Sequence, residues 1–376
     1  MIDEKGKKVF VGMSGGVDSS VSAALLRQAG YDVTGVFIKA WHPDFLACTW
    51  RNDRQDAMAV CAKLRIPFET CDLEAEYKRD VVDYLVREYT AGRTPNPDVM
   101  CNRHIKFGAF YGFARERGAD YIAMGHYART LKEGREVLNS KSKVSSSKYR
   151  VPQGTSRLLK GIDSSKDQSY FLWAADREAL VHTLFPIGEL TKTEVRSLAQ
   201  NFGLSVATKK DSQGVCFLGH VSIGDFLKRF VDVVPGDVLN EVGQTIGRHD
   251  GALMYTIGQR HGFTVRVKKP DDGPLYVVSK DVDANTITVS HDGKVGMRFS
   301  IEAAVLRDVN WIADVPTDGT QLTCRFRYRQ PLVSCTVLRD DGKTTVRFDT
   351  PQVAVTSGQS LVLYDGDECL GGGVIV

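Results

Sequence analysis

Short apolar runs alternate with amphipathic segments over the first 215 residues of the chain. The runs typical of strands are Val9–Val11, Tyr31–Ala40, Pro67–Leu73 and Tyr121–Gly125. The segments with helical spacing are Val17–Gln28, Asp53–Arg65, a stretch through Val82, Leu85 and Tyr89, Ile105–Arg117 and Gln168–Leu180. This alternation predicts an α/β fold, with a mainly parallel sheet covered by helices on both faces.

The pattern changes near residue 216, beyond which short β-type runs are separated by Gly, Asp, Pro and Asn. These runs include Leu253–Ile257, Thr286–Ser290, Leu322–Tyr328 and Ser360–Tyr364. They predict small antiparallel barrels or sandwiches. We therefore divide the chain into an α/β domain (1–215), a small central β-rich domain (216–296) and a C-terminal β-barrel (297–376). Before the change, Thr191-Lys-Thr-Glu194 predicts a capping box that opens a helix ending near Gly203.

Composition narrows the class of protein. With 42% hydrophobic and 25% charged residues, the 376-residue chain resembles an ordinary globular protein. No apolar run approaches the roughly 20 residues that span a bilayer, and the charged N-terminus does not resemble a signal peptide. We therefore expect a cytoplasmic protein with no membrane partner. The formal net charge is only +3, so nucleic-acid binding would need locally gathered positive charge. The eight cysteines include no CxxC pair, which argues against a zinc ribbon or a CxxC-ligated iron–sulfur cluster.

Residues 12–19, which we call the glycine-rich loop, read Gly-Met-Ser-Gly-Gly-Val-Asp-Ser between the first strand and the first helix. Adjacent glycines let backbone amides approach a phosphate, and the helix N-terminus adds partial positive charge. The GxxxxGK[ST] and G-x-G-x-x-G patterns of other nucleotide loops are both absent. Because Asp18 repels a phosphate unless a divalent cation lies between them, the loop predicts a phosphate site that uses Mg²⁺.

Two cysteines lie in contexts that suit chemistry. Cys101 follows a proline-rich loop and stands at or near the start of a helix, with three basic residues in the next five positions. Helix starts and neighbouring cations lower the pKa of a thiol and make it a nucleophile. Asp98, three residues upstream, suits either a general acid/base or a helix cap. Cys216 follows Gly214 at the apparent end of the α/β region, where we expect a flexible loop.

These stretches together resemble the bacterial tRNA-specific 2-thiouridylase family, a branch of the N-type ATP pyrophosphatases with their SGGxDS signature. The matching segments follow the family order over nearly the full length: Gly12–Ser19, Asn96–Asp98, Cys101–Phe107, Met124–Ala128, Lys166–Phe171, Gly214–Gly219, Tyr255–Arg260, Arg325–Tyr328, Ala354–Gln359 and Leu370–Gly373.

The resemblance implies an enzyme that replaces the C2 oxygen of the wobble uridine in tRNA by sulfur. ATP adenylates that oxygen and yields AMP and pyrophosphate. Cys216 carries sulfur as a persulfide received from a donor protein, either a cysteine desulfurase or a sulfur-relay protein. Cys101 is the nucleophile that closes a transient disulfide with Cys216, and Asp98 handles the proton. The tRNAs for Lys, Glu and Gln are the substrates that the family leads us to expect.

The resemblance also implies binding residues. The nucleotide would be bound by Gly12, Met13, Ser14, Gly15, Gly16, Val17, Asp18, Ser19, Ile38 and Gly125. The tRNA would be contacted by Asn96, Pro97, Asp98, His126, Lys166, Asp167, Gln168, Arg327, Tyr328 and Gln359. Such residue types suit an extruded base and its phosphates. In a strand, the run Arg325–Arg329 places its three arginines on one face. An ordinary solvated strand face over Phe326 and Tyr328 explains that run equally well.

Some features depart from the family pattern. They are residues 42–58 with Cys48, the Ser/Lys-rich loop at 138–150, and Ser357, where the family usually has proline.

Three other hypotheses stay open. An amidating ligase of the same superfamily needs neither two reactive cysteines nor a basic C-terminal β-region. A 4-thiouridine-type or iron–sulfur-dependent tRNA thiolase is the second, and the missing CxxC argues against its cluster-dependent form. A noncatalytic RNA-binding protein is the third, and the intact glycine-rich loop argues against it.

Overall fold

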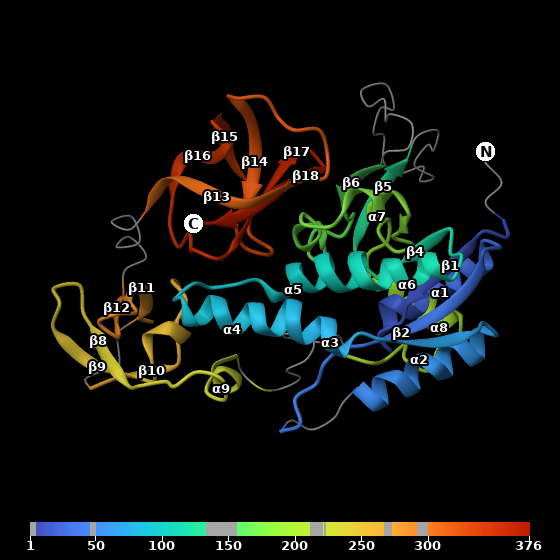
Figure 1. The fold of residues 1–376 in the computed structure, drawn as a ribbon, viewed down its shortest axis with the longest axis horizontal. Helices are drawn as coiled ribbons and strands as arrows, with labels where there is room; N and C mark the ends of the chain where they lie inside the picture. Colours follow the sequence, from blue (N-terminus) through green and yellow to red (C-terminus); the bar gives the residue numbers. More distant parts are fainter. Residues whose placement is uncertain are drawn as a thin grey trace.

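The computed structural model describes residues 5–45, 50–132, 156–210, 221, 223–266, 273–291 and 300–376. These residues form a parallel sheet with helices on both faces, a smaller central sheet and a C-terminal barrel (Figure 1). The predicted α/β part followed by two β-rich parts is therefore confirmed. No helix among the described residues is long and apolar enough to cross a membrane.

The first sheet has the strand order β3-β2-β1-β4-β7, with every neighbouring pair parallel. Its strands are β1 (Lys8–Gly12), β2 (Asp32–Lys39), β3 (Phe68–Asp72), β4 (Tyr121–Ala123) and β7 (Thr183–Leu184). Helices α1 (Val17–Gln28), α2 (Trp50–Leu64) and α8 (Lys192–Asn201) pack with Val9 and Val11 on one face. Phe10 packs on the other face, in a second apolar cluster with the helices described next. The sheet is therefore covered on both sides, as its apolar strands require.

Two helical stretches cross the molecule side by side beneath the barrel (Figure 1). The first comprises α3 (Glu74–Tyr77), η1 (Lys78–Val82) and α4 (Asp83–Thr90). The second comprises α5 (Pro97–Met100), η2 (Cys101–Ala109) and α6 (Phe110–Glu116). It begins before the predicted Ile105 because the Asn96 side chain accepts a hydrogen bond from the Val99 amide at 3.3 Å. Cys101 is thus the fifth residue of its helix and not at the start, and the cap is Asn96 rather than Asp98.

The prediction of one helix over Gln168–Leu180 is wrong. The chain forms the short turn η4 (Ser169–Phe171) and then the separate helix α7 (Arg177–Val181). Asp176 starts α7 afresh, because its side chain accepts hydrogen bonds from the Glu178 and Ala179 amides. The capping box at Thr191 is confirmed, and it opens α8.

The central part is a sheet with the strand order β10-β9-β8-β12-β11, preceded by the short helix α9 (Ile223–Leu227). Its strands are β8 (Gly236–Leu239), β9 (Thr245–His249), β10 (Phe263–Val265), β11 (Tyr276–Asp281) and β12 (Thr286–Ser290). The predicted strand Leu253–Ile257 is wrong, because Ala252–Met254 form the helical turn η5. Gly251, at φ +159°, starts that turn.

The C-terminal barrel closes through the pairing of β13 with β18. Its strands are β13 (Ile301–Trp311), β14 (Thr320–Arg325), β15 (Val333–Asp340), β16 (Lys343–Gln352), β17 (Ser360–Asp365) and β18 (Glu368–Ile375). Strands β5 (Ala128–Lys132) and β6 (Ser156–Lys160) of the α/β part pair with each other, and β6 also pairs with β18. The first and last parts of the chain therefore share one sheet.

The arginine run Arg325–Arg329 does not form the predicted strand face. Strand β14 ends at Arg325, and Arg329 has φ +63°, which turns the chain. Arg325 is buried and its Nη1 atom lies 3.3 Å from the Asp167 carboxylate, whereas Arg329 is exposed. Since the strand ends, the three arginines have separate surroundings rather than one shared face.

Candidate functional site

The glycine-rich loop joins the end of β1 to the start of α1, as predicted. It turns at Gly15, where φ is +71° and an added Cβ atom would lie 2.2 Å from the Asp53 carbonyl oxygen. The Ser19 hydroxyl braces the turn: it accepts a hydrogen bond from the Ser14 amide and donates one to the Gly16 carbonyl, both at 3.2 Å. Gly16 precedes α1 without a side-chain cap. A braced glycine turn before an uncapped helix start fits a phosphate group.

The loop lies where the chain changes direction across the sheet. From β1 the chain passes to β2 on one side, whereas β4 pairs with β1 on the other. In open α/β sheets, ligands bind in the crevice at the carboxyl ends of the strands at such a point. Gly125 follows β4 there, and an added Cβ atom would lie 2.7 Å from the Ser19 amide nitrogen. Ile38 is half-buried near the end of β2. The predicted nucleotide residues therefore gather at one edge of the sheet.

Lys192 reaches this loop from the first position of α8. Its ammonium group donates to both carboxylate oxygens of Asp18, at 2.8 and 2.9 Å, and the Tyr127 hydroxyl donates to the same carboxylate at 2.8 Å. Neither Lys192 nor Tyr127 was predicted from the sequence. The sequence does contain a signal for Lys192. A lysine in the first turn of a helix is unfavourable beside the positive end of the helix dipole, so its presence there indicates another role.

Lys209 is a second lysine at the loop that was not predicted from the sequence. Its ammonium group donates to the Gly15 carbonyl at 3.1 Å, to Asp53 at 2.8 Å and to Asp56 at 2.6 Å. Burial lowers the pKa of Lys209, but the hydrogen bonds to these two carboxylates outweigh that effect and raise the pKa above its usual value. Lys209 therefore stays charged and ties α2 to the loop.

Asp98 and Cys101 lie on the second helical stretch, away from the strands. Cys101 is buried, with 7% of its surface exposed, and Asp98 is partly exposed. Burial raises the pKa of Asp98 above its usual value, and the positive charge of Lys106 partly offsets this effect. A raised carboxyl pKa suits proton transfer near neutral pH. Cys216 lies outside the described residues, as do Cys48 and the loop at 138–150.

His126 connects the two halves of the site, because it follows Gly125 and contacts Lys106. Its ring is 6% exposed, and burial, followed by the charge of Lys106, lowers its pKa well below the usual value. The Lys106 ammonium lies 3.3 Å from Nε2. Since an ammonium group only donates, Nε2 accepts and Nδ1 carries the ring proton. Within the described part of the chain Nδ1 has no hydrogen-bond partner, so this buried N–H suits a partner from elsewhere.

The segment Lys166–Gln168 is fixed to the strand edge next to His126. The Gln168 side chain accepts a hydrogen bond from the Tyr127 amide at 3.0 Å. Asp167 is 3% exposed, and it accepts hydrogen bonds from two backbone amides and from Arg325 of the barrel. Asp167 therefore holds its segment in place, whereas Lys166 and Gln168 are only half-buried.

The remaining predicted tRNA contacts lie where the three parts of the chain meet. Asn96 and the buried Pro97 begin the second helical stretch. Arg327 donates from Nη2 to one backbone carbonyl of the central part and one of the barrel, at 2.6 and 2.9 Å. The Gln359 side-chain amide donates to the carbonyl of a residue in the loop before Asn96, at 2.9 Å. The ring of Tyr328 packs against a ring of the α/β part, with centroids 4.6 Å apart.

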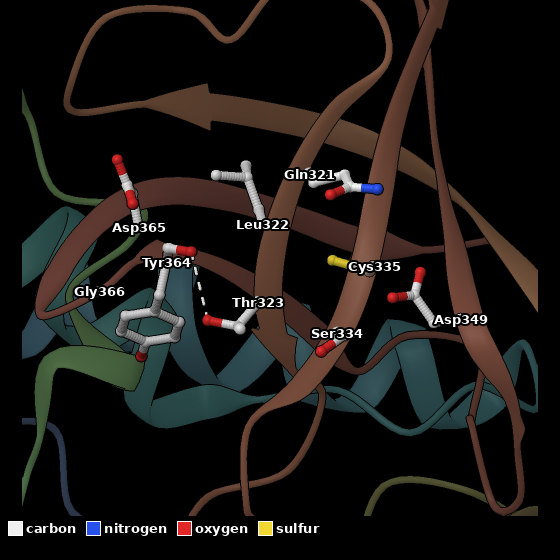
Figure 2. A pocket seen from close by; sticks show the side chains of 9 residues that line it. All are labelled: Gln321, Leu322, Thr323, Ser334, Cys335, Asp349, Tyr364, Asp365 and Gly366. Carbon is white, nitrogen blue, oxygen red and sulfur yellow. Dashed lines mark hydrogen bonds between the residues drawn. The ribbon is translucent and has the colours of Figure 1, made fainter.

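Two cavities lie among the described residues, and only the second includes a predicted site residue, Asp167. One of about 230 Å³ opens on the barrel wall and is lined by Gln321, Leu322, Thr323, Ser334, Cys335, Asp349, Tyr364, Asp365 and Gly366 (Figure 2). The other, of about 220 Å³, is lined by Arg129, Lys160, Gly161, Ile162, Ser164, Asp167, Arg325 and Asp367. The first has carboxylates but no cation in its lining, which does not suit a polyanion. The charges of the second pair mainly with one another.

Three family models match the chain in order. A tRNA methyl transferase HUP domain matches residues 7–220, a tRNA methyl transferase PRC-barrel domain 224–291, and an aminomethyltransferase beta-barrel domain 302–375. Among solved structures, the U34-tRNA thiolase NcsA from Methanococcus maripaludis is 17% identical, with a TM-score of 0.35. That match covers 62% of this chain and 67% of the other, and it is too distant to add to the assignment.

Sequence relatives are much closer. The tRNA-specific 2-thiouridylase MnmA of Pseudomonas fluorescens is 45% identical over 99% of this chain and 96% of its own length. The protein of the same name from Shewanella pealeana is 46% identical over 98% of this chain and 96% of its own length. With this similarity over nearly the whole length of both chains, the protein belongs to the tRNA-specific 2-thiouridylase family.

Proposed function

We propose that the protein is a tRNA-uridine 2-sulfurtransferase that uses ATP to replace the C2 oxygen of the wobble uridine by sulfur. Beyond family membership, one observation carries this proposal. Consecutive contacts lead from the glycine-rich loop through Gly125, His126 and Lys106 to the helix that bears Asp98 and Cys101. This continuity supports a single site in which a phosphate-binding loop and a nucleophile act together, as an activation-then-substitution reaction requires.

ATP is a substrate of the proposed reaction and supplies the adenylyl group that makes the uridine oxygen a leaving group. The uridine oxygen attacks the α-phosphorus and pyrophosphate leaves. The terminal sulfur of the Cys216 persulfide then attacks C2, and the C2–O bond breaks to release AMP. The Cys101 thiolate attacks the Cys216 sulfur, so that the S–S bond breaks, sulfur stays on uridine and a Cys101–Cys216 disulfide forms. An external thiol reduces that disulfide before the next cycle.

The chain's own residues support these steps in different ways. The amides of the glycine-rich loop face the phosphates, and Lys192 and Lys209 supply positive charge beside it. Asp98 accepts or returns a proton, for which its raised pKa is suited. His126 offers its Nδ1–H to the bound nucleic acid or nucleotide.

Mg²⁺ is part of the proposal. Mg²⁺ commonly binds one or two carboxylates together with the phosphates of a substrate. Asp18 is the residue that would hold it, because it is the acidic residue of the glycine-rich loop. Its carboxylate is bonded to Lys192 and Tyr127, so metal binding would compete with those bonds. A metal ion there would add positive charge against the phosphates.

The proposed partners are tRNAs for Lys, Glu and Gln and a sulfur donor, either a cysteine desulfurase or a relay protein, in the cytoplasm. The tRNA contacts are Asn96, Pro97, Asp98, His126, Lys166, Gln168, Arg327, Tyr328 and Gln359. We give Asp167 the role of holding this segment, because its carboxylate is buried. We keep domain boundaries at 1–215, 216–296 and 297–376.

A thiolation assay on unmodified tRNA tests the proposal. Sulfide or a desulfurase serves as donor, and a thiol-sensitive gel detects product, with Cys101→Ala and Cys216→Ala beside the wild type. We expect ATP-dependent 2-thiouridine in the wild type. When the desulfurase is the donor, we expect none in Cys101→Ala and none in Cys216→Ala. AMP release onto another acceptor without 2-thiouridine would instead support an amidating ligase, and tRNA binding without any ATP-dependent product would support a noncatalytic RNA-binding protein.

A further inference from the structure

Residues 92–98, which we call the base loop, lead from the end of α4 into the first two residues of α5 and lie where the central part and the barrel meet (Figure 1). The barrel holds this loop through its backbone. The Thr94 amide donates to the Ser357 carbonyl at 2.9 Å, and the Gln359 side chain donates to the Thr94 carbonyl at 2.9 Å. Gly358 lies between them, and a Cβ atom added there would be 2.9 Å from the Thr94 amide nitrogen. Thr94 is thus bound on both backbone groups.

The central part holds the same residue from another direction. The Thr256 and Thr94 hydroxyl oxygens are 3.2 Å apart and share a hydrogen bond. Val282 packs on the start of the base loop, where a Cβ atom added to Gly92 would be 2.7 Å from its Cγ2 atom. Two separate segments of the chain therefore meet at Thr94.

Arg327 ties these two segments to each other. Its Nη2 atom donates to the Ile257 carbonyl of the central part and to the Ala354 carbonyl of the barrel. The segments are Tyr255–Arg260 and Ala354–Gln359, two of the stretches that match the family order, in which only Gln359 has a proposed role, as a tRNA contact. Their shared feature in the structure is contact with the base loop or with each other.

A buried ion cluster anchors the start of the base loop. Glu88 is 3% exposed and accepts two hydrogen bonds from Arg93, at 2.6 and 2.9 Å. Arg307, on β13 of the barrel, donates to the same carboxylate at 2.8 Å. The barrel therefore holds the base loop directly at Thr94 and, through Glu88, at Arg93.

We infer that segments 255–260 and 354–359, with Arg307, form a clamp that positions the base loop, and that Thr256 and Arg307 are positioning residues for Asn96 and Asp98. This inference rests on the proposed function for its catalytic consequence, but the clamp itself does not. The central part and the barrel then set the rate of the reaction and not only the affinity for tRNA. Substituting a residue that acts only in domain packing would change stability without changing either the hydrogen exchange of the base loop or the rate of thiolation.

The test uses the full-length protein and compares Thr256→Val with Thr256→Ser, which keeps the hydroxyl. Thr264→Val is the matched control. Thr264 also donates one hydrogen bond, to the Arg248 carbonyl at 3.2 Å, but this bond joins β10 to β9 and does not involve the base loop. Arg307→Met and Arg307→Lys form a second pair. Hydrogen–deuterium exchange reports the protection of residues 92–100. Single-turnover thiolation with sulfide, at saturating tRNA and over a pH series, reports rate, and filter binding reports tRNA affinity.

We expect about fivefold faster exchange of the base loop in Thr256→Val and Arg307→Met, the effect of losing one hydrogen bond. The rate at saturating tRNA falls several-fold, while the tRNA dissociation constant stays within twofold of the wild type. The midpoint of the pH–rate profile moves down, because a loosened loop admits water to Asp98. Thr256→Ser, Arg307→Lys and Thr264→Val behave like the wild type.

Unchanged exchange in both Thr256→Val and Arg307→Met would overturn the inference, even with a lowered melting temperature. Faster exchange with an unchanged rate would overturn the positioning role. If the wild type forms no 2-thiouridine, the proposed function fails, whereas the exchange comparison still decides whether the clamp exists.

Discussion

Replacing Lys192 by methionine removes a positive charge from the nucleotide site and leaves the length of the side chain almost unchanged. Lys192 is 13% exposed in its side chain, and it binds Asp18, which is 32% exposed. Two unit charges 4 Å apart interact by about 4 kcal/mol at an effective dielectric of 20 and by about 1 kcal/mol in water. A phosphate of bound ATP would meet Lys192 in the same partly exposed surroundings. For that attraction we take an intermediate value of about 2.7 kcal/mol, which corresponds to about 100-fold in rate.

We therefore expect Lys192→Met to form AMP and pyrophosphate about 100-fold more slowly than the wild type in the presence of tRNA and sulfide. Release of pyrophosphate in a single turnover, with ATP varied, measures this rate and the apparent ATP affinity together. Lys7→Met is a matched control, because Lys7 also pairs with a carboxylate, Asp120 at 3.1 Å, but precedes β1 at the opposite edge of the sheet. A Lys192→Met rate within twofold of both wild type and control would refute the role assigned to this lysine.

Three further changes give separable results. Gly125→Ala places a Cβ atom 2.7 Å from the Ser19 amide nitrogen, so we expect at least about tenfold weaker ATP binding by calorimetry. Unaltered binding would contradict a nucleotide site formed by the glycine-rich loop and Gly125. Lys106→Met removes the charge that lowers the pKa of Asp98, so the midpoint of the pH–rate profile should rise, and a fall would refute the coupling. Hydrogen bonds from Arg93, opposed by burial and helped by Arg307, lower the pKa of Glu88. The contribution of ionised Glu88 to the stability of the fold is therefore present above the unfolded-state pKa of this carboxyl group and lost as the pH falls through its folded-state pKa. Glu88→Gln should cost about 2 kcal/mol in urea unfolding at pH 7 and less at pH 4; an equal loss at both pH values would exclude the ion pairs as its source.

Local patterns predicted the elements whose causes are local. The strand before the glycine-rich loop, α1 and the capping box of α8 depend on neighbouring residues, and the structure has them where the sequence indicated. The prediction that Arg325–Arg329 form one strand face was wrong, because alternation alone does not show where a strand ends. A residue with positive φ, Arg329, turns the chain just beyond β14, and no local pattern marked that turn.

The charged groups of the site could be predicted only in part. Asp18 and Cys101 stand in recognisable stretches, but Lys192 and Lys209 reach the loop across 174 and 194 residues of sequence. Such pairings depend on the tertiary fold rather than on spacing. The same applies to Thr94, whose partners Thr256 and Ser357 come from the two later parts of the chain.

The most direct measurement follows one oxygen atom. Unmodified tRNA transcribed with ¹⁸O at C2 of uridine is incubated with the protein, ATP and sulfide, and AMP and nucleosides are analysed by mass spectrometry. If the uridine oxygen attacks the α-phosphorus and leaves with AMP, each 2-thiouridine formed is matched by one AMP that carries ¹⁸O. Unlabelled AMP, or 2-thiouridine formed without AMP, would contradict activation of the uridine oxygen by ATP.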